Sequence, residues 1–282
     1  MLRITYVSFP GLGIEEFKLN SVAFTIGNHP IAWYGIIITC GILLATACVL
    51  YRAKQEGVAV DDILDLGLYT VLFAVIGARL FYVLTSLDEF HSFWDVFKIW
   101  NGGIAIYGAI IAGAVTVYVY CRIKKRVFYQ FLDMIAPGVQ LGQIIGRWGN
   151  FMNGEAHGGP TDIFCRMGLR FGTYGTTVYY HPTFLYESLW NLVGFVLINL
   201  FYKKKRYNGQ IVLMYLTWYG FGRMLIEQLR TDSLYLFGSL YEVWWLKISS
   251  LIGLFSFLIF GGILLYHAIK GTRRATAYSL ND

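Results

Sequence analysis

Five ionisable residues lie within long apolar stretches of this 282-residue sequence, where burying a charge is costly. They are Arg79, Arg147, Glu187, Arg223 and Glu227. An arginine guanidinium can bind a phosphate through two parallel hydrogen bonds, which are strong in a medium of low dielectric constant. Three arginines against two carboxylates leave positive charge over, so the pattern predicts an anion site, most naturally for a phospholipid headgroup. A structural arginine–glutamate bridge packed between helices is the alternative interpretation.

The spacing of Tyr219, Arg223, Glu227 and Arg230 strengthens the prediction of a site. These residues follow i, i+4, i+8 and i+11 spacing, which places them on one face of a helix. Their polar groups would therefore face the same neighbour.

The segment from Gly146 to Gly158 is too polar and too rich in glycine for a lipid-facing helix. Its glycines would let backbone N–H groups approach a ligand closely. Asn150 and Asn153 supply amide donors, and Glu155 can orient an arginine or accept a proton. A glycine-packed helix end with polar caps is the less specific alternative.

These residues must be positioned by membrane-spanning helices. Hydrophobic residues make up 56% of the chain and charged residues only 14%, against roughly 25% charged in a typical globular protein. Mean hydropathy is +0.53, and several windows approach the twenty residues that cross about 30 Å of hydrocarbon. We predict an all-α membrane protein that forms a single domain over residues 1–282. Seven spans are predicted, at 31–51, 67–87, 103–121, 132–151, 183–202, 211–229 and 248–269.

The distribution of lysine and arginine predicts which way the spans run. The loops after spans one, three and five and the C-terminal tail hold 13 of these residues, against 7 on the opposite side. The positive-inside rule then places the N-terminus outside and the C-terminus in the cytoplasm. Arg79, Arg147 and Arg223 would lie roughly 18–22 Å from the inner ends of their spans. The intramembrane charges are therefore expected at the midplane or in the outer half of the bilayer.

The 31-residue connection at residues 152–182 is predicted to form a small extracytoplasmic cap between spans four and five, because loops of this length are usually functional or disordered. The net charge of +6 indicates loop bias or contact with anionic lipid rather than with nucleic acid, since the basic residues form short clusters beside the spans. The four cysteines show no C-x-x-C pair and no histidine at metal spacing, so we expect no metal and no cofactor.

The polar segment also resembles a family signature. Residues from Gly146 to Gly158 match each fixed position of G-R-x-G-N-F-x-N-x-E-x-x-G, which is typical of prolipoprotein diacylglyceryl transferases. The resemblance extends along most of the chain. Its further motifs are Trp33-Tyr34-Gly35, Gly102-Gly103-Ile104, Asp133 with Pro137, His181-Pro182 followed by Leu185-Tyr186-Glu187, and Tyr219-Gly220 followed by Arg223, Glu227 and Arg230.

The resemblance implies a multi-pass enzyme of the bacterial plasma membrane with its active site toward the extracytoplasmic side. Such an enzyme moves the diacylglyceryl group of phosphatidylglycerol to the lipobox cysteine thiol in the signal peptide of a preprolipoprotein. A thioether forms and glycerol phosphate leaves. The implied catalytic residues are Arg147, Arg223, Tyr107 and Glu155. The expected substrate-binding residues are Tyr34, Arg79, Asn150, Asn153, Gly158, His181, Glu187, Glu227 and Arg230.

Tyr107 departs from the family pattern. Many members carry histidine in a segment like G-G-x-x-x-H-G, and that histidine is a proposed base for the thiol. This chain has Tyr107 there, and a tyrosine with its ordinary pKa near 10 is a poor base near neutral pH. Tyr107 could act as a phenolate beside an arginine or only donate a hydrogen bond. In the second case the substrate phosphate, Glu155 or His157 could accept the proton.

Two other classes of protein compete with the transferase. An anionic phospholipid transporter or scramblase would also use intramembrane arginines, but a translocation path should continue polar to the inner face, and no inverted repeat is visible. An intramembrane hydrolase would need a Ser–His dyad or paired aspartates at membrane depth, which the spans do not offer.

Overall fold

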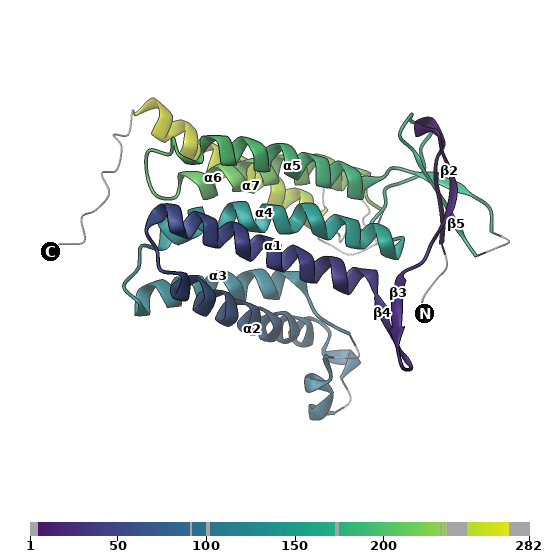
Figure 1. Cartoon of the computed structure of the whole chain (residues 1–282), viewed down its shortest axis with the longest axis horizontal. Coiled ribbons are helices and arrows are strands. Elements are labelled where there is room, and N and C mark those ends of the chain that lie inside the picture. Colours follow the sequence, from purple (N-terminus) through teal and green to yellow (C-terminus); the bar gives the residue numbers. More distant parts are fainter. Residues whose placement is uncertain are drawn as a thin grey trace. The chain divides into compact units, whose positions relative to one another are not determined.

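The computed structural model describes residues 5–90, 92–99, 102–172, 175–231, 233, 235 and 247–270. The described chain is mostly helical (Figure 1). Its α-helices are α1 (Trp33–Glu56), α2 (Val60–Thr85), α3 (Ile106–Ile123), α4 (Phe128–Asn153), α5 (Thr183–Tyr202), α6 (Gln210–Ile226) and α7 (Ile248–Ile269). The chain divides into two compact units. The first consists of Met1–Ala47 and Ile135–Asp282, and the second of Cys48–Met134. Arg3, Arg273 and Arg274, which contribute to the orientation count, lie outside the described residues.

Each predicted span contains a helix. The predicted bounds 183–202 and 248–269 coincide with those of α5 and α7. Helix α1 continues past the end of its predicted span, α2 begins before the start of its span, and α4 is longer than its span at both ends. Five helices are long and apolar enough to cross a membrane by length and composition: α1, α2, α3, α5 and α7. The described chain is therefore that of a mostly helical membrane protein. Helix α4 continues through the buried Pro137, which membrane helices tolerate where neighbouring helices surround the break.

The expectation of an all-α fold is wrong for the first unit. Its N-terminal residues form β1 (Thr5–Phe9), β2 (Ile14–Leu19), β3 (Val22–Ile26) and β4 (His29–Ala32), and the connection after α4 contains β5 (Met167–Phe171) and β6 (Val178–Tyr180). Strands β2, β1, β5 and β6 form one antiparallel sheet in that order, and β3 pairs with β4. The predicted cap at 152–182 thus shares its sheet with a segment more than 140 residues earlier in the chain.

The sheet has its own hydrophobic core, which fixes the end of α4. Val7, Phe9 and Leu19 from the N-terminal strands pack with Met167 and Leu169 of β5. The core also contains Phe184 at the start of α5, whose ring stacks on that of Phe151 in α4 with centroids 4.6 Å apart. This contact places the C-terminal end of α4 beside the start of α5.

Glycines on α4 allow close packing against α1. A Cβ atom at Gly142 or Gly146 would reach van der Waals distance of Ala45 or Ile38, and one at Gly149 would press on the Tyr34 ring at 3.1 Å. Small residues at helix interfaces let backbones approach closely in membranes. The glycine spacing in the signature therefore also has a packing role.

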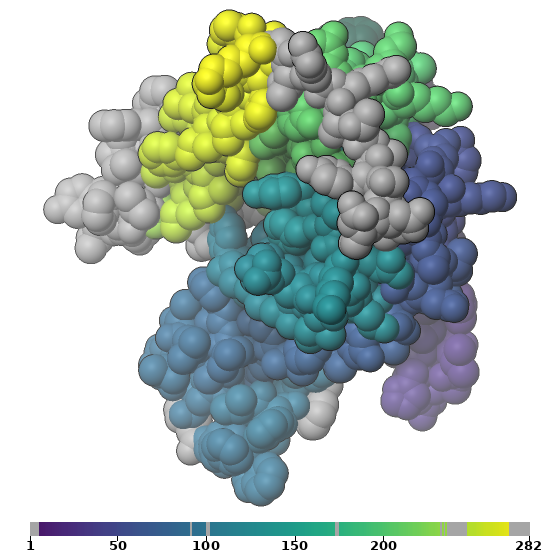
Figure 2. All heavy atoms as spheres, turned by 90° about the vertical axis from the view of Figure 1, so that its left-hand side faces the viewer, coloured from purple at the N-terminus to yellow at the C-terminus, as the bar shows by residue number. Residues whose placement is uncertain are grey.

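Helix α6 packs along α7 through a similar contact between Gly220 and Gly253. In Figure 2 the surface of α7, in yellow, adjoins the green surface of the α5–α6 segment. Helices α5 and α6 are joined by stacked indole rings of Trp190 and Trp218, each of which donates to the other's backbone carbonyl. Helices α4, α5 and α6 therefore hold a fixed arrangement in which their polar residues can meet.

The second unit is built on the pair α2 and α3. Their backbones touch at Gly77 and Gly108, where a Cβ on Gly77 would lie 2.7 Å from the carbonyl oxygen of Gly108. At the other end of the pair, Asp62 accepts hydrogen bonds from Arg126 at 2.6 Å and from Tyr120 at 3.2 Å.

Candidate active site

A cluster of arginines surrounds one buried glutamate in the first unit. The carboxylate of Glu187 on α5 lies 2.5 Å from an Nη atom of Arg147 on α4 and 3.0 Å from one of Arg223 on α6. Arg230, which follows α6, approaches the same carboxylate at 3.4 Å. Arg223 also contacts Glu227 at 2.7 Å. These five residues form what we call the arginine–glutamate cluster.

Within the cluster, the glutamate side chains are more deeply buried than the arginine side chains. The Glu187 and Glu227 side chains are 4% and 2% exposed, whereas those of Arg147 and Arg223 are 18% and 15% exposed. Three guanidinium groups against two carboxylates give the cluster a net positive charge. The structure therefore brings together the intramembrane charges predicted on α4, α5 and α6, and these groups can neutralise a bound anion.

Lys247 supports the cluster and was missed by the sequence reasoning. Its buried ammonium group donates to the backbone carbonyls of Glu227, Gln228 and Arg230 at 3.0, 3.2 and 2.7 Å. These carbonyls belong to the short 3-10 helix Glu227–Leu229 that follows α6 and to the residue after it. No motif marks this role, because Lys247 stands alone just before an apolar span.

The end of α4 forms a polar turn around Glu155. The side-chain amides of Asn150 and Asn153 both donate to the same carboxylate oxygen of Glu155, at 3.1 and 3.2 Å. Gly154 adopts a φ of +65°, in the left-handed region that glycine favours, which lets the chain reverse after the helix. The three predicted polar residues of the signature are thus in mutual contact.

Gly158 joins this turn to the segment that holds Arg230. Its N–H donates to the carbonyl of His181, and the N–H of Gly159 donates to the carbonyl of Leu229, each at 2.8 Å. A Cβ on Gly158 would lie 2.6 Å from the Cβ of His181 and 2.8 Å from the Leu229 carbonyl oxygen. Only glycine fits such a close approach of three backbone segments.

A cavity opens beside the polar turn. It has a volume of about 380 Å³, and its lining residues are Asn153, Gly154, Glu155, Ala156, His157, Phe171 and Thr231. Its walls come from the turn, from β5 and from the segment after α6. A polar or peptide group could enter here next to the Glu155 carboxylate.

Tyr34 and His181 flank the same region. The Tyr34 ring at the start of α1 lies against Gly149, one residue before Asn150, because a Cβ at that glycine would be 3.1 Å from the ring. The His181 imidazole is 3.4 Å from the Tyr186 hydroxyl. Burial lowers the pKa of His181 below its ordinary value, so the neutral imidazole is favoured.

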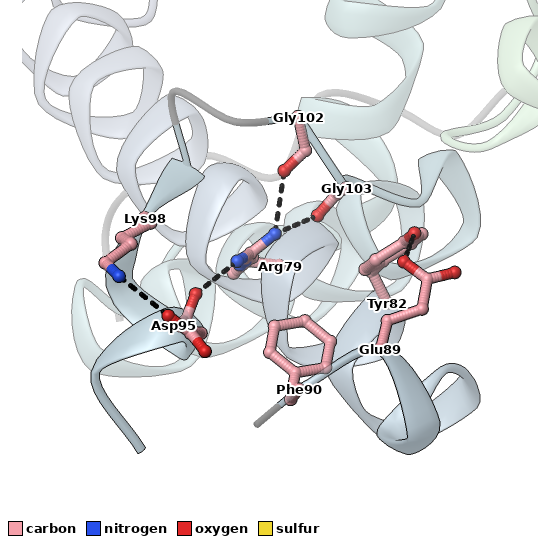
Figure 3. Close-up of a pocket in the computed structure, with 8 residues that line it drawn as sticks. All are labelled: Arg79, Tyr82, Glu89, Phe90, Asp95, Lys98, Gly102 and Gly103. Carbon is pink, nitrogen blue, oxygen red and sulfur yellow. Dashed lines mark hydrogen bonds and ion pairs between the residues drawn. The ribbon is translucent and has the colours of Figure 1, made fainter. Parts of the chain in front are cut away.

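Arg79 and Tyr107 belong to the second unit. Arg79 on α2 is buried, and its guanidinium donates to the backbone carbonyl of Val96 and to those of Asp95, Gly102 and Gly103, which Figure 3 shows. Tyr107 is the second residue of α3 and is partly buried. Whether either residue contacts substrate stays a prediction.

The fold and the cluster together define a class: a mostly helical membrane protein with a positively charged site among three helices. The chain matches the family model described as prolipoprotein diacylglyceryl transferase over residues 21–266. It is 48% identical over 223 residues to phosphatidylglycerol--prolipoprotein diacylglyceryl transferase 1 of Clostridium perfringens, covering 77% of this chain and 85% of that protein. A Lysinibacillus sphaericus protein named phosphatidylglycerol--prolipoprotein diacylglyceryl transferase is 41% identical over 267 residues, covering 90% and 94%. A Clostridium botulinum protein of that name is 39% identical over 261 residues, covering 91% and 100%.

The chain belongs to the prolipoprotein diacylglyceryl transferase family. The family assignment made from the signature is therefore confirmed.

Proposed function

We propose that this protein transfers the diacylglyceryl group of phosphatidylglycerol to the lipobox cysteine thiol of preprolipoproteins. The relatives named above carry both substrates in their names. The observation that supports the proposal most strongly is the contact of three arginines with the single carboxylate of Glu187. That arrangement offers an anion site of fixed geometry, which fits the phosphate of the donor lipid.

In the proposed reaction the cysteine thiolate attacks the glycerol carbon that carries the phosphate. A carbon–sulfur bond forms, the carbon–oxygen bond to phosphate breaks, and glycerol phosphate leaves with the bonding electrons. Arg147 and Arg223 bind the phosphate and neutralise the charge that grows on it. One preorganised donor of this kind is typically worth about 3–4 kcal/mol of barrier. Glu187 and Glu227 hold the guanidinium groups in place, and Arg230 adds further positive charge.

The thiol must lose a proton before or during the attack. A cysteine thiol has a pKa near 8.5, so it needs only modest help to ionise. Glu155 is one acceptor, since its carboxylate borders the cavity that we assign to the peptide. His157 lines the same cavity, and the substrate phosphate and Tyr107 remain the other candidates. Tyr34, Asn150, Asn153, Gly158 and His181 shape the site around these groups.

The location of the site follows from the charge distribution. The excess of lysine and arginine in the loops after spans one, three and five and in the tail supports a cytoplasmic C-terminus across seven spans. The polar turn and the sheet would then lie on the extracytoplasmic side of the bacterial plasma membrane. This is the side at which exported preprolipoproteins emerge.

The test is mass spectrometry of a lipobox peptide incubated with the purified protein and phosphatidylglycerol. We expect a diacylglyceryl mass on the cysteine with the wild-type protein and with Arg122→Ala, which removes an exposed arginine at the end of α3. The product should be lost with Arg147→Ala. A wild-type protein that binds the lipid but leaves the peptide unmodified would overturn the proposal and favour an anionic phospholipid transporter.

A further inference from the structure

The guanidinium of Arg79 in the second unit donates hydrogen bonds to four backbone carbonyls. Its Nε donates to the carbonyl of Val96 at 2.8 Å, and one Nη donates to that of Asp95 at 2.6 Å. The other Nη donates to the carbonyls of Gly102 and Gly103, both at 2.7 Å. Four hydrogen bonds from five N–H groups leave little capacity for a phosphate.

Two chain segments meet at this guanidinium (Figure 3). Asp95 and Val96 belong to the short 3-10 helix Phe93–Phe97, and Gly102 and Gly103 precede α3. The group also lies over the Phe90 ring, with its central carbon 5.1 Å from the ring centroid. The guanidinium therefore holds the described parts of the α2–α3 connection against α2.

The glycine turn needs such a partner. Gly102 and Gly103 have φ angles of +88° and +76°, two successive residues in the left-handed region. Their carbonyls accept from one nitrogen of Arg79, which fixes the direction in which the chain enters α3. The N–H of Ala105 then donates to the carbonyl of Ala78, next to Arg79, at 3.0 Å.

The charged groups around Arg79 are also paired with one another. The Asp95 carboxylate pairs with Lys98 at 2.7 Å and accepts from the N–H of Ser92 at 3.0 Å, while the Tyr82 hydroxyl donates to Glu89 at 2.5 Å. The adjoining cavity measures only about 180 Å³. These charges already have partners, which is unlike the surplus of positive charge in the arginine–glutamate cluster.

From this geometry we infer that Arg79 is a positioning residue: its planar fork sets the glycine turn and thereby places Tyr107, four residues after Gly103, for the transfer reaction. This role replaces the expectation that Arg79 binds substrate, and it rests on the proposed function. Lysine is a poor substitute, because its three N–H donors share one nitrogen and cannot reach four carbonyls arranged around the edge of a planar guanidinium.

The test compares Arg79→Lys with Arg126→Lys, which keeps the charge at the other end of the same helix pair, where Arg126 contacts Asp62. We expect Arg79→Lys to lower kcat about 10- to 100-fold, the usual effect of a displaced active-site group. The KM for phosphatidylglycerol should stay within about twofold, and Arg126→Lys should keep the wild-type kcat. A raised KM for the lipid with unchanged kcat would show that Arg79 is a ligand and overturn the inference.

A double-mutant cycle separates positioning from general support of the fold. If Arg79 acts through Tyr107, then Arg79→Lys combined with Tyr107→Phe should be no more than about twofold slower than Tyr107→Phe alone. If Arg79→Lys slows the Tyr107→Phe variant as much as it slows the wild type, the inference is overturned. If Arg79→Lys does not fold, Gly102→Ala takes its place, since its added Cβ meets open space and acts only through the strained φ. If the wild-type protein itself does not transfer the diacylglyceryl group to the peptide, that result instead contradicts the proposed function.

Discussion

Arg223 and Arg79 are arginines on apolar helices with little exposed side-chain surface, yet their partners differ. Arg223 is compensated by the carboxylates of Glu187 and Glu227, and Arg147 and Arg230 also contact Glu187. All hydrogen bonds that the described residues make with the Arg79 guanidinium come from backbone carbonyl acceptors. A shared carboxylate leaves guanidinium donors for a ligand, whereas a set of carbonyls uses them up. An arginine in a membrane helix therefore indicates a binding site only when its donors are not already taken.

The largest effect should come from Glu187→Gln, because this carboxylate contacts three arginines. Its loss removes an ion pair from each of them, and breaking a buried ion pair typically costs about 3–5 kcal/mol. We expect the transfer rate, followed by mass spectrometry of the lipobox peptide, to fall on the order of 100-fold or more. Glu16→Gln, which breaks the pair that the more exposed Glu16 makes with Arg170 in the sheet, is the matched control and should keep the wild-type rate. A folded Glu187→Gln protein with full activity would show that the arginines are positioned without this glutamate.

Arg223→Lys sharpens the contrast with Arg79→Lys. It keeps the charge of the arginine–glutamate cluster but removes the fork that binds phosphate at two points. We expect kcat/KM for phosphatidylglycerol to fall about 10- to 100-fold, with a clear rise in KM. Steady-state kinetics with lipid in mixed micelles measures both terms. An unchanged KM for Arg223→Lys would remove the distinction that we draw between the two arginines.

Gly158→Ala tests whether backbone contact holds Arg230 near Glu187. The new Cβ would press on His181 and on the Leu229 carbonyl, and overpacking of this kind typically costs about 1–3 kcal/mol. We expect a lower melting temperature and a transfer rate reduced about tenfold, a loss comparable with about 1.4 kcal/mol. Gly159→Ala is the control, since its Cβ would meet only Thr231 at 3.9 Å. Equal effects of the two substitutions would contradict this explanation.

The smallest effect concerns pH. Burial lowers the pKa of His181, so the unfolded chain takes up this proton at a higher pH than the folded protein does. The contribution to stability is complete above the ordinary pKa of about 6.5 and is lost as pH falls through the lower folded-state pKa. The melting temperature of the wild type should therefore fall more steeply below pH 6.5 than that of His181→Asn. Parallel profiles would show that this imidazole does not contribute.

Long apolar windows located the helices well, because each span must satisfy its own backbone hydrogen bonds in lipid. The bounds of α5 and α7 coincide with the prediction for this reason. The N-terminal strands were missed, and with them the composition of the cap. Val7 and Phe9 find their partners Met167 and Leu169 only through pairing across most of the chain, which local pattern does not encode.

The site residues divide in the same way. Residue types and spacing alone determined that charges would lie within the helices, that Arg223, Glu227 and Arg230 would share a face, and that residues 146–158 would be too polar to face lipid. Which charges meet was decided by tertiary structure. Glu187 joins three arginines because α4, α5 and α6 pack together, and Lys247 reaches the cluster from the start of α7. In the sequence, Arg79 is like Arg223 an arginine within an apolar span. Only the folded chain supplies the four carbonyls that occupy its donors, because hydrogen bonds between distant segments depend on how the backbone returns to them.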